Sequence, residues 1–338
     1  MKVHIIGGGN LGVSIALGIA KFSKNNQVTV TRRNTASIQY LTEYGITVSN
    51  DNKHNIQEAD IVILTIKPYQ VDIVLAEILP VIKGKTIASA VSGLSLDMLT
   101  SKTNNEFPVI RIMPNIAAQF GESATCISFP EKDREKALPI VDLFQDLGTA
   151  PVIDEKLMDA ATVLGACGTA YALRYIRASM QAGIEIGFDS QTALAIAAQF
   201  GESATCISFP EKDREKALPI VDLFQDLGTA PVIDEKLMDA ATVLGACGTA
   251  YALRYIRASM QAGIEIGFDS QTALAIAAQT VKGAAKMLLE EKVHPEQLID
   301  RVTTPQGCTI VGLNEMEHNG FSSSLIKGIK TSLKQIKG

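Results

Sequence analysis

The sequence predicts an α/β fold: a doubly wound parallel sheet at the N-terminus, followed by an all-helical region. Three observations support this prediction. A glycine-rich turn separates an apolar run from a helical pattern within residues 1–34, and apolar runs then alternate with helical patterns to about residue 150. Beyond Pro151 the apolar spacing becomes that of helices.

The glycine-rich turn is the first element. Lys2–Ile6 is an apolar run, and Gly7-Gly-Gly-Asn-Leu-Gly12 leads from it into a helical pattern. In a dinucleotide-binding turn of a Rossmann domain, Gly7 makes the tight turn, Gly9 lets the backbone approach a pyrophosphate, and Gly12 allows close helix–strand packing. The helix N-terminus, with Asn10 and Leu11, would face the phosphates. A plain packing turn is the alternative.

The end of the second strand indicates which dinucleotide binds. An NAD site has Asp or Glu there, whereas this chain has Arg32, Arg33 and Asn34 after Val28–Thr31. Two guanidinium groups suit a 2′-phosphate, so NADPH is favoured and NADH should bind more weakly. A solvated basic turn is the alternative.

The following segments continue the alternation. We expect a helix near 35–43, strands at 46–49, 60–66, 86–90 and 109–113, and a helix from Pro68 to about Ile82. In such sheets ligands bind beyond the carboxyl ends of the strands. The expected cofactor rim is therefore formed by residues at or just after the strand ends: Ile66, Lys67, Pro68, Val91, Met113 and Asn115. Each of them could also simply end its strand.

Composition limits the function classes. The chain has 338 residues, 46% of them hydrophobic and 20% charged, with a net charge of −5, so neither a nucleic-acid footprint nor a polybasic membrane patch is indicated. We expect a cytoplasmic protein with no nucleic-acid or membrane partner. The five cysteines and four histidines lack metal-ligand spacing, and no disulfide framework or metal site is expected.

A long internal duplication interrupts the chain. Residues 116–199 recur without substitution as residues 196–279, an offset of 80 positions. The two copies share Ile-Ala-Ala-Gln at their junction, as recombination between short direct repeats would leave. Because natural repeats diverge and solenoids need at least three units, a recent, engineered or erroneous duplication is favoured. Removing 80 residues leaves an ordinary chain of 258.

The second half of the sequence is predicted to form helices and one candidate functional loop. A stripe of small residues runs through 154–188, typical of close helix packing, and 280–290 continues in helix. Between them and the last helices lies a proline–glycine loop, Thr303–Ile310, that leads into another helix. Its successive N–H groups and the helix N-terminus could hold a carboxylate. An ordinary helix cap would look similar. The candidate substrate residues are Thr304, Gln306, Gly307, Cys308 and Thr309.

Together these residues resemble the pyrroline-5-carboxylate reductase family. The resemblance rests on the segments at 6–12, 66–68, 111–115, 294–295 and 304–309, and on Met316-Glu317 with Gly320-Phe321. It implies NADPH-dependent reduction of a small imino acid, 1-pyrroline-5-carboxylate, to L-proline. It also implies a helical dimerisation domain that intertwines with a partner chain in a homodimer or higher homo-oligomer, with a site shared between protomers. By position, Thr309 would be the catalytic residue, bonded to the ring nitrogen, and Asn52 would lie near the adenosine ribose.

Two positions depart from the family pattern. The family has Gly-Gly where this loop has Gln306-Gly307, and a Ser-Gly-Ser-Gly-Pro-Ala helix start appears here as Gly165–Ala170 and again as Gly245–Ala250. Other readings stay open: another imine reductase, a β-hydroxyacid dehydrogenase or a non-catalytic NADPH-binding protein. A dehydrogenase of that kind would need a Lys on the first long helix, and 157–188 contains none.

The duplication permits a structural prediction. Short connections favour the first strand copy, 123–129, in the sheet, and should place the C-terminal helices from Thr280 on the adjacent copy, 234–279. The expected domains are 1–153 for NADPH, 154–233 as surplus, and 234–338 for substrate and dimerisation. We also expect the chain to be less stable and more prone to associate than its 258-residue deletion, because one apolar strand lacks a sheet.

Overall fold

A seven-stranded sheet forms the centre of the N-terminal part in a computed structural model that describes residues 1–200 and 203–337. Its strand order is β3-β2-β1-β4-β5-β6-β8, and all neighbours are parallel except β6 and β8. The strands are β1 (Lys2–Ile6), β2 (Gln27–Thr31), β3 (Thr47–Ser49), β4 (Ile61–Leu64), β5 (Thr86–Ser89), β6 (Val109–Met113) and β8 (Cys126–Ser128). This order confirms the predicted doubly wound α/β fold.

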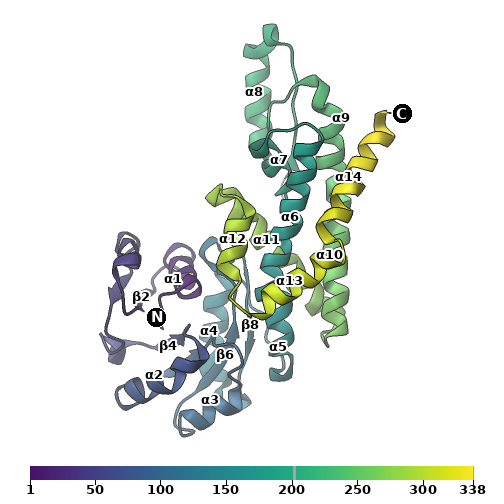
Figure 1. Ribbon diagram of the computed structural model, residues 1–338. Coiled ribbons are helices and arrows are strands. Elements are labelled where there is room, and N and C mark those ends of the chain that lie inside the picture. The colour runs from purple at the N-terminus through teal and green to yellow at the C-terminus, as the bar shows by residue number, and fades with distance from the viewer. Residues whose placement is uncertain (201–202, 338) are drawn as a thin grey trace. The chain divides into compact units, whose positions relative to one another are not determined.

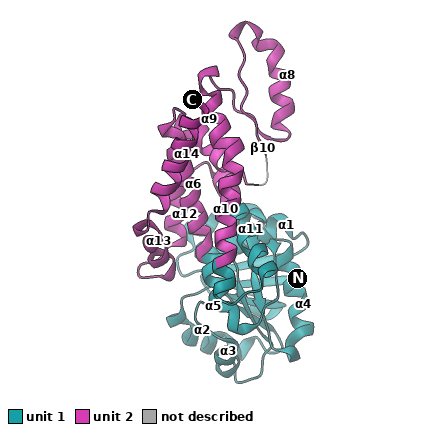
Figure 2. Cartoon of the chain, turned by 90° about the vertical axis from the view of Figure 1, so that its right-hand side faces the viewer, with its two compact units in different colours: residues 1–166, 262–283 teal, residues 167–261, 284–338 magenta. Residues whose placement is uncertain are grey.

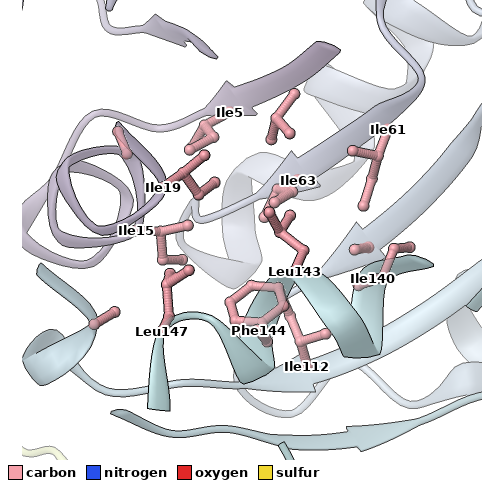
Figure 3. Packing of buried hydrophobic residues seen from close by; sticks show 14 of the residues in the cluster. Ile5, Ile15, Ile19, Ile61, Ile63, Ile112, Ile140, Leu143, Phe144 and Leu147 are labelled. Carbon is pink, nitrogen blue, oxygen red and sulfur yellow. The ribbon is translucent and has the colours of Figure 1, made fainter. Parts of the chain in front are cut away.

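Helices cover both faces of this sheet. They are α1 (Asn10–Phe22), α2 (Val71–Ile78), α3 (Leu96–Lys102) and α4 (Arg134–Gln145), with a 3-10 helix η1 at Ala36–Tyr44. Because strand side chains alternate, Ile61 and Ile63 of β4 pack with α1 and α4, whereas Val62 and Leu64 pack with α2 and α3. Figure 3 shows Ile15, Ile19 and Phe144 in the cluster that Ile61 and Ile63 form with α1 and α4.

The first copy of the duplicated segment supplies the last strand. β8 pairs antiparallel with β6, with Arg111 opposite Ser128 and Met113 opposite Cys126, so the predicted placement of the first strand copy is confirmed. Arg111 is almost fully buried and bonds Glu155 at 2.8 Å and Asp159 at 3.0 Å. That ion pair ties the sheet to the start of the first helical copy.

The second copy of the strand–helix unit lies outside this sheet. β10 (Ser203–Ala204) pairs only with β11 (Gly228–Thr229) within the described residues, just as β7 (Ser123–Ala124) pairs with β9 (Gly148–Thr149). In α4, Leu143 is 2% exposed, but its counterpart Leu223 in α8 (Arg214–Gln225) is 62% exposed. The second strand–helix copy therefore repeats the local structure of the first without the burial that the seven-stranded sheet provides.

The chain divides into two compact units, each described by itself (Figure 2). The first comprises Met1–Ala166 and Ala262–Gly283, and the second comprises Cys167–Gln261 and Ala284–Gly338. The remaining helices are α5 (Met158–Ala161), α6 (Gly168–Glu185), α7 (Ser190–Ala197), α9 (Met238–Ala241), α10 (Cys247–Glu265), α11 (Ser270–Glu291), α12 (Pro295–Val302), α13 (Cys308–His318) and α14 (Phe321–Lys337) (Figure 1). The predicted helix at 154–188 is divided by a π-helical turn at Thr162–Cys167.

The last three helices pack on α6 of the first copy, so the expectation that they pack on 234–279 is wrong for α12 and α13 and holds only in part for α14. Arg174 of α6 bonds Glu296 of α12 at 3.1 Å, and Glu185 bonds Lys330 of α14 at 2.7 Å. α14 also contacts α9 of the second copy. The expectation rested on short connections, and it failed because α6 of the first copy offers these helices the same face as its equivalent in the second copy.

Candidate active site

The glycine turn after β1 has the geometry of a phosphate-binding turn. Gly7 has φ +112°, in a region that glycine favours, and its N–H bonds the carbonyl of Thr31 at 3.1 Å. A Cβ at Gly12 would lie 2.2 Å from the carbonyl oxygen of Gly7, so this position needs glycine for packing. A Cβ at Gly9 would meet nothing within 4 Å, which leaves open space where a pyrophosphate could approach.

Helix α1 begins directly behind this turn. Gly9 is its N-cap, followed by Asn10 and Leu11, and its first turn carries no acidic residue. The partial positive charge of the helix N-terminus is therefore not offset by a carboxylate in that turn. Thr65 of the loop after β4 braces the turn, because its hydroxyl donates to the carbonyl of Gly7 at 2.7 Å.

The basic residues after β2 have two different environments. Arg32 donates from Nη1 to the carbonyl of Gly8 at 2.8 Å and thereby holds the glycine turn from the side. Arg33 and Asn34 are exposed, and the Asn34 side chain accepts from the N–H of Ala36 at 3.2 Å. Arg33 is therefore the cation of this pair that does not brace the turn.

Asn52 lies in a polar contact beside β2. Its Oδ1 accepts from the Thr31 hydroxyl at 2.7 Å, and its Nδ2 donates to Glu77 at 2.9 Å. Nearby, His4 of β1 is 1% exposed, and burial lowers its pKa to about 4. A neutral histidine enclosed by the sheet fits a structural role.

The expected cofactor rim follows β4, β5 and β6. The strand register aligns Ile6 with Leu64 and Leu64 with Ser89, so the ends of these parallel strands share one edge with the glycine turn. Ile66 is half-buried, Lys67 and Pro68 are exposed, and Val91 and Met113 are buried. Asn115 is buried and caps the next turn by accepting from the N–H of Ala117 at 3.1 Å.

The candidate substrate loop joins α12 to α13 in the second unit. Thr304, Gln306 and Cys308 are exposed, Gly307 is half-buried and is the N-cap of α13, and Thr309 is buried in the first turn. Gln306 has φ +60°, so the loop does have a left-handed position, and a non-glycine residue occupies it. A Cβ at Gly307 would lie 2.4 Å from the hydroxyl oxygen of Thr304.

The Thr309 hydroxyl contacts one cysteine, Cys167, which in turn contacts Cys308, and sequence reasoning did not link these thiols to the hydroxyl. Thr309 Oγ1 donates to Cys167 Sγ at 3.1 Å, and Cys167 Sγ lies 3.4 Å from Cys308 Sγ. Burial raises the pKa of Cys167 to about 12, so this thiol stays protonated at neutral pH. The departure from the family pattern at Gly165–Ala170, which contains Cys167, was the available signal.

The candidate cofactor residues all lie in the first unit, and the candidate substrate residues all lie in the second. Among the described residues no group of three or more His, Cys, Asp or Glu could hold a metal. None of the described helices is both long and apolar enough to cross a membrane.

Comparison with known proteins identifies the family. A family model for pyrroline-5-carboxylate reductase dimerisation matches residues 155–216 and 235–338, and one for NADP oxidoreductase, coenzyme F420-dependent, matches residues 2–93. Pyrroline-5-carboxylate reductase 2 of Dictyostelium discoideum is 36% identical over 337 residues, which cover 98% of this chain and 90% of that protein. The chain belongs to the pyrroline-5-carboxylate reductase family. Its N-terminal sheet is accordingly an NADP-binding domain, followed by a helical dimerisation region.

Two further similarities complete the comparison. Pyrroline-5-carboxylate reductase 1 of D. discoideum is 36% identical over 334 residues, and the chain spans about half, 48%, of its length. The crystal structure of pyrroline carboxylate reductase from Plasmodium falciparum with NADP bound is 19% identical, with 99% and 96% of the two chains covered and a TM-score of 0.43.

Two glycines of the turn offer a matched test. Gly12→Ala should destabilise the fold by about 1–3 kcal/mol because its Cβ would overpack against Gly7. Gly9→Ala should leave stability within about 0.5 kcal/mol, because Gly9 has an extended backbone and open space, yet it should weaken NADPH binding. Urea unfolding and cofactor titration measure the two effects. Equal losses of stability would contradict this geometry.

A second test concerns the left-handed residue of the substrate loop. Gln306→Gly should stabilise the chain by up to about 1 kcal/mol. An L-residue in the left-handed region costs roughly 1–2 kcal/mol, and removing this strain is partly offset by the larger conformational entropy that glycine loses on folding. Gln306→Ala, which keeps the Cβ, is the control and should give no gain. Thermal unfolding compares the stability of the three proteins. A gain in stability for alanine equal to that for glycine would contradict backbone strain at Gln306.

Proposed function

We propose that this chain reduces 1-pyrroline-5-carboxylate to L-proline with NADPH as the reductant, the last step of proline biosynthesis. The observation that carries the proposal is the similarity over nearly the whole chain to a D. discoideum protein that is named as this reductase. The candidate site is consistent with it, because a glycine turn suited to a dinucleotide and a loop suited to a small carboxylate are both present.

The proposed chemistry asks little of the side chains. The substrate is a cyclic imine, which becomes electrophilic when its nitrogen is protonated. NADPH, held by the turn at Gly7–Gly12 and by Arg33, would supply the hydride. The protein would supply position: the N-terminus of α13 and the loop N–H groups would hold the carboxylate.

The hydroxyl of Thr309 would act as an acceptor at the ring nitrogen. Its proton is directed to Cys167 Sγ, so a lone pair remains for a second partner. A protonated imine has an N–H and no lone pair on nitrogen, so it can only donate. The orientation imposed by Cys167 therefore favours the reactive, protonated form of the substrate.

Other candidates remain distinguishable. Another imine reductase would turn over a different cyclic imine faster, and a non-catalytic NADPH-binding protein would bind the cofactor without oxidising it. Absorbance of NADPH during incubation with pyrroline-5-carboxylate separates these cases from the proposal. Absence of turnover by the full chain and its 258-residue deletion would refute the proposal.

Cofactor choice is tested by separating the two arginines. Arg33→Ala should raise the KM for NADPH roughly 10- to 100-fold, the loss of one charge-assisted contact of about 1.5–3 kcal/mol, and should leave the KM for NADH little changed. Arg32→Ala should weaken both cofactors, because Arg32 also braces Gly8. Steady-state kinetics with both cofactors measure these KM values. An equal effect of Arg33→Ala on the KM for NADPH and for NADH would contradict a 2′-phosphate contact.

The role of Thr309 is tested by a pair of substitutions. Thr309→Ala should lower kcat at least about 10-fold, a loss of roughly 1.4 kcal/mol of transition-state stabilisation, while NADPH affinity stays unchanged. Thr309→Ser keeps the hydroxyl and should restore most of the turnover. Normal kinetics together with a lowered melting temperature would instead show that Thr309 only caps α13.

A further inference from the structure

The two copies of the duplicated segment contact each other at equivalent residues. Tyr175 of α6 and Tyr255 of α10 are the same residue of the two copies, and their rings stack with centroids 4.9 Å apart and an interplanar angle of 25°. Burial raises the pKa of Tyr175 to about 12, consistent with an enclosed position. A residue that packs on its own equivalent is the contact that a two-fold axis produces.

The helices that carry these tyrosines run in opposite directions. A Cβ at Gly183 would lie 2.8 Å from Leu244 Cδ2. Gly183 follows Tyr175 along α6, whereas Leu244 precedes Tyr255 in the second copy. Because both pairs belong to the second unit, α6 and α10 are antiparallel there. An antiparallel pair of identical helices again has two-fold character.

The same contacts recur in the first unit with the copies exchanged. A Cβ at Gly263, the equivalent of Gly183, would lie 2.9 Å from Leu164, the equivalent of Leu244. Two more reciprocal pairs are present. A Cβ at Gly187 would lie 3.0 Å from Leu237, and one at the equivalent Gly267 would lie 3.2 Å from Leu157. A Cβ at Gly245 would lie 3.6 Å from Ile196, and one at the equivalent Gly165 would lie 3.6 Å from Ile276. In an isologous interface residue i of one partner contacts residue j of the other, and j contacts i in return.

These contacts cannot form within one copy. Leu164 and Gly183 lie 19 positions apart on the helical segment 158–185, which is about 28 Å along a helix axis, so Leu164 cannot contact Gly183 of its own copy. The side chain beside Gly183 is Leu244 of the second copy. The exchanged side chains are buried: Leu244 is 3% exposed and Leu164 is 7% exposed. Burial of apolar side chains on both partners is typical of a permanent interface core.

We propose that the duplication builds, within one chain, the intertwined helix pair that a dimerisation domain otherwise forms between two chains. The partner of the first helical copy, 158–199, is the second copy, 238–279, of the same molecule. The apolar face around Tyr175 is therefore occupied in cis, and the pairing does not depend on protein concentration. This inference concerns assembly and is independent of the reaction.

Cross-linking tests whether the pairing is in cis. The variant Tyr175→Cys/Tyr255→Cys, treated with a short bis-maleimide, should give a cross-linked product with the intact mass of one chain. Tyr175→Cys alone should give no two-chain product above that of the unmutated protein, which controls for the five native cysteines. Intact mass is the required readout, because peptides from the two copies have identical sequences.

The 258-residue deletion provides the matched positive control. It has a single copy, so its Tyr175→Cys variant should cross-link into two-chain products. A two-chain product from the full-length Tyr175→Cys variant, or only two-chain products from the double variant, would overturn the proposal.

A second measurement needs no substitution at the tyrosines. The melting temperature of the unmutated full chain should stay constant over a 100-fold range of concentration, whereas that of the deletion should rise. An equal rise for both chains would also overturn the proposal.

Discussion

One sheet edge, at β6, is available to two identical strands. The burial to be gained by pairing there is the same for either copy, because Ile140 and Leu143 have identical counterparts, Ile220 and Leu223, in the second copy. Only the connection differs: Cys126 lies 13 positions after Met113, whereas Cys206 lies 93 positions after it. By loop-closure entropy the longer connection costs roughly 2 kcal/mol more, which favours the first copy about 20- to 30-fold. The placement of β8 follows from that difference.

The same reasoning does not decide the helices, and here sequence analysis reached its limit. The sheet, the glycine turn and the first strand copy could be predicted because each has a local signal: strand periodicity, glycine at Gly7 and Gly12, or a short connection. The choice between helix copies has no such signal, because identical segments present identical faces. Which copy α12 and α14 contact is therefore determined by tertiary packing alone, and the short-connection argument failed for them.

Other features also required three-dimensional information. The helix α3 (Leu96–Lys102) has too short a pattern to be recognised, and only the structure shows that Gln306 adopts a left-handed backbone, with φ +60°. The contact between Thr309 and Cys167 joins positions 142 residues apart. No spacing rule relates such positions, although Cys167 lies in the segment Gly165–Ala170, where the sequence departs from the family pattern.

The internal helix pair is symmetric in its packing but asymmetric in its chemistry. Glu155 and Asp159 of the first copy bond Arg111. Arg111 precedes the duplicated segment, so it occurs once in the chain. Likewise, Cys167 receives the Thr309 hydroxyl, whereas its equivalent Cys247 is only half-buried. The chain contains a single Thr303–Thr309 loop, and that loop is bonded to the first copy. In a dimer of two single-copy chains each copy would have its own loop and its own sheet. Among the described residues the second copy has no such loop and only the two-stranded pair β10–β11, so it can complete the interface without adding a second site.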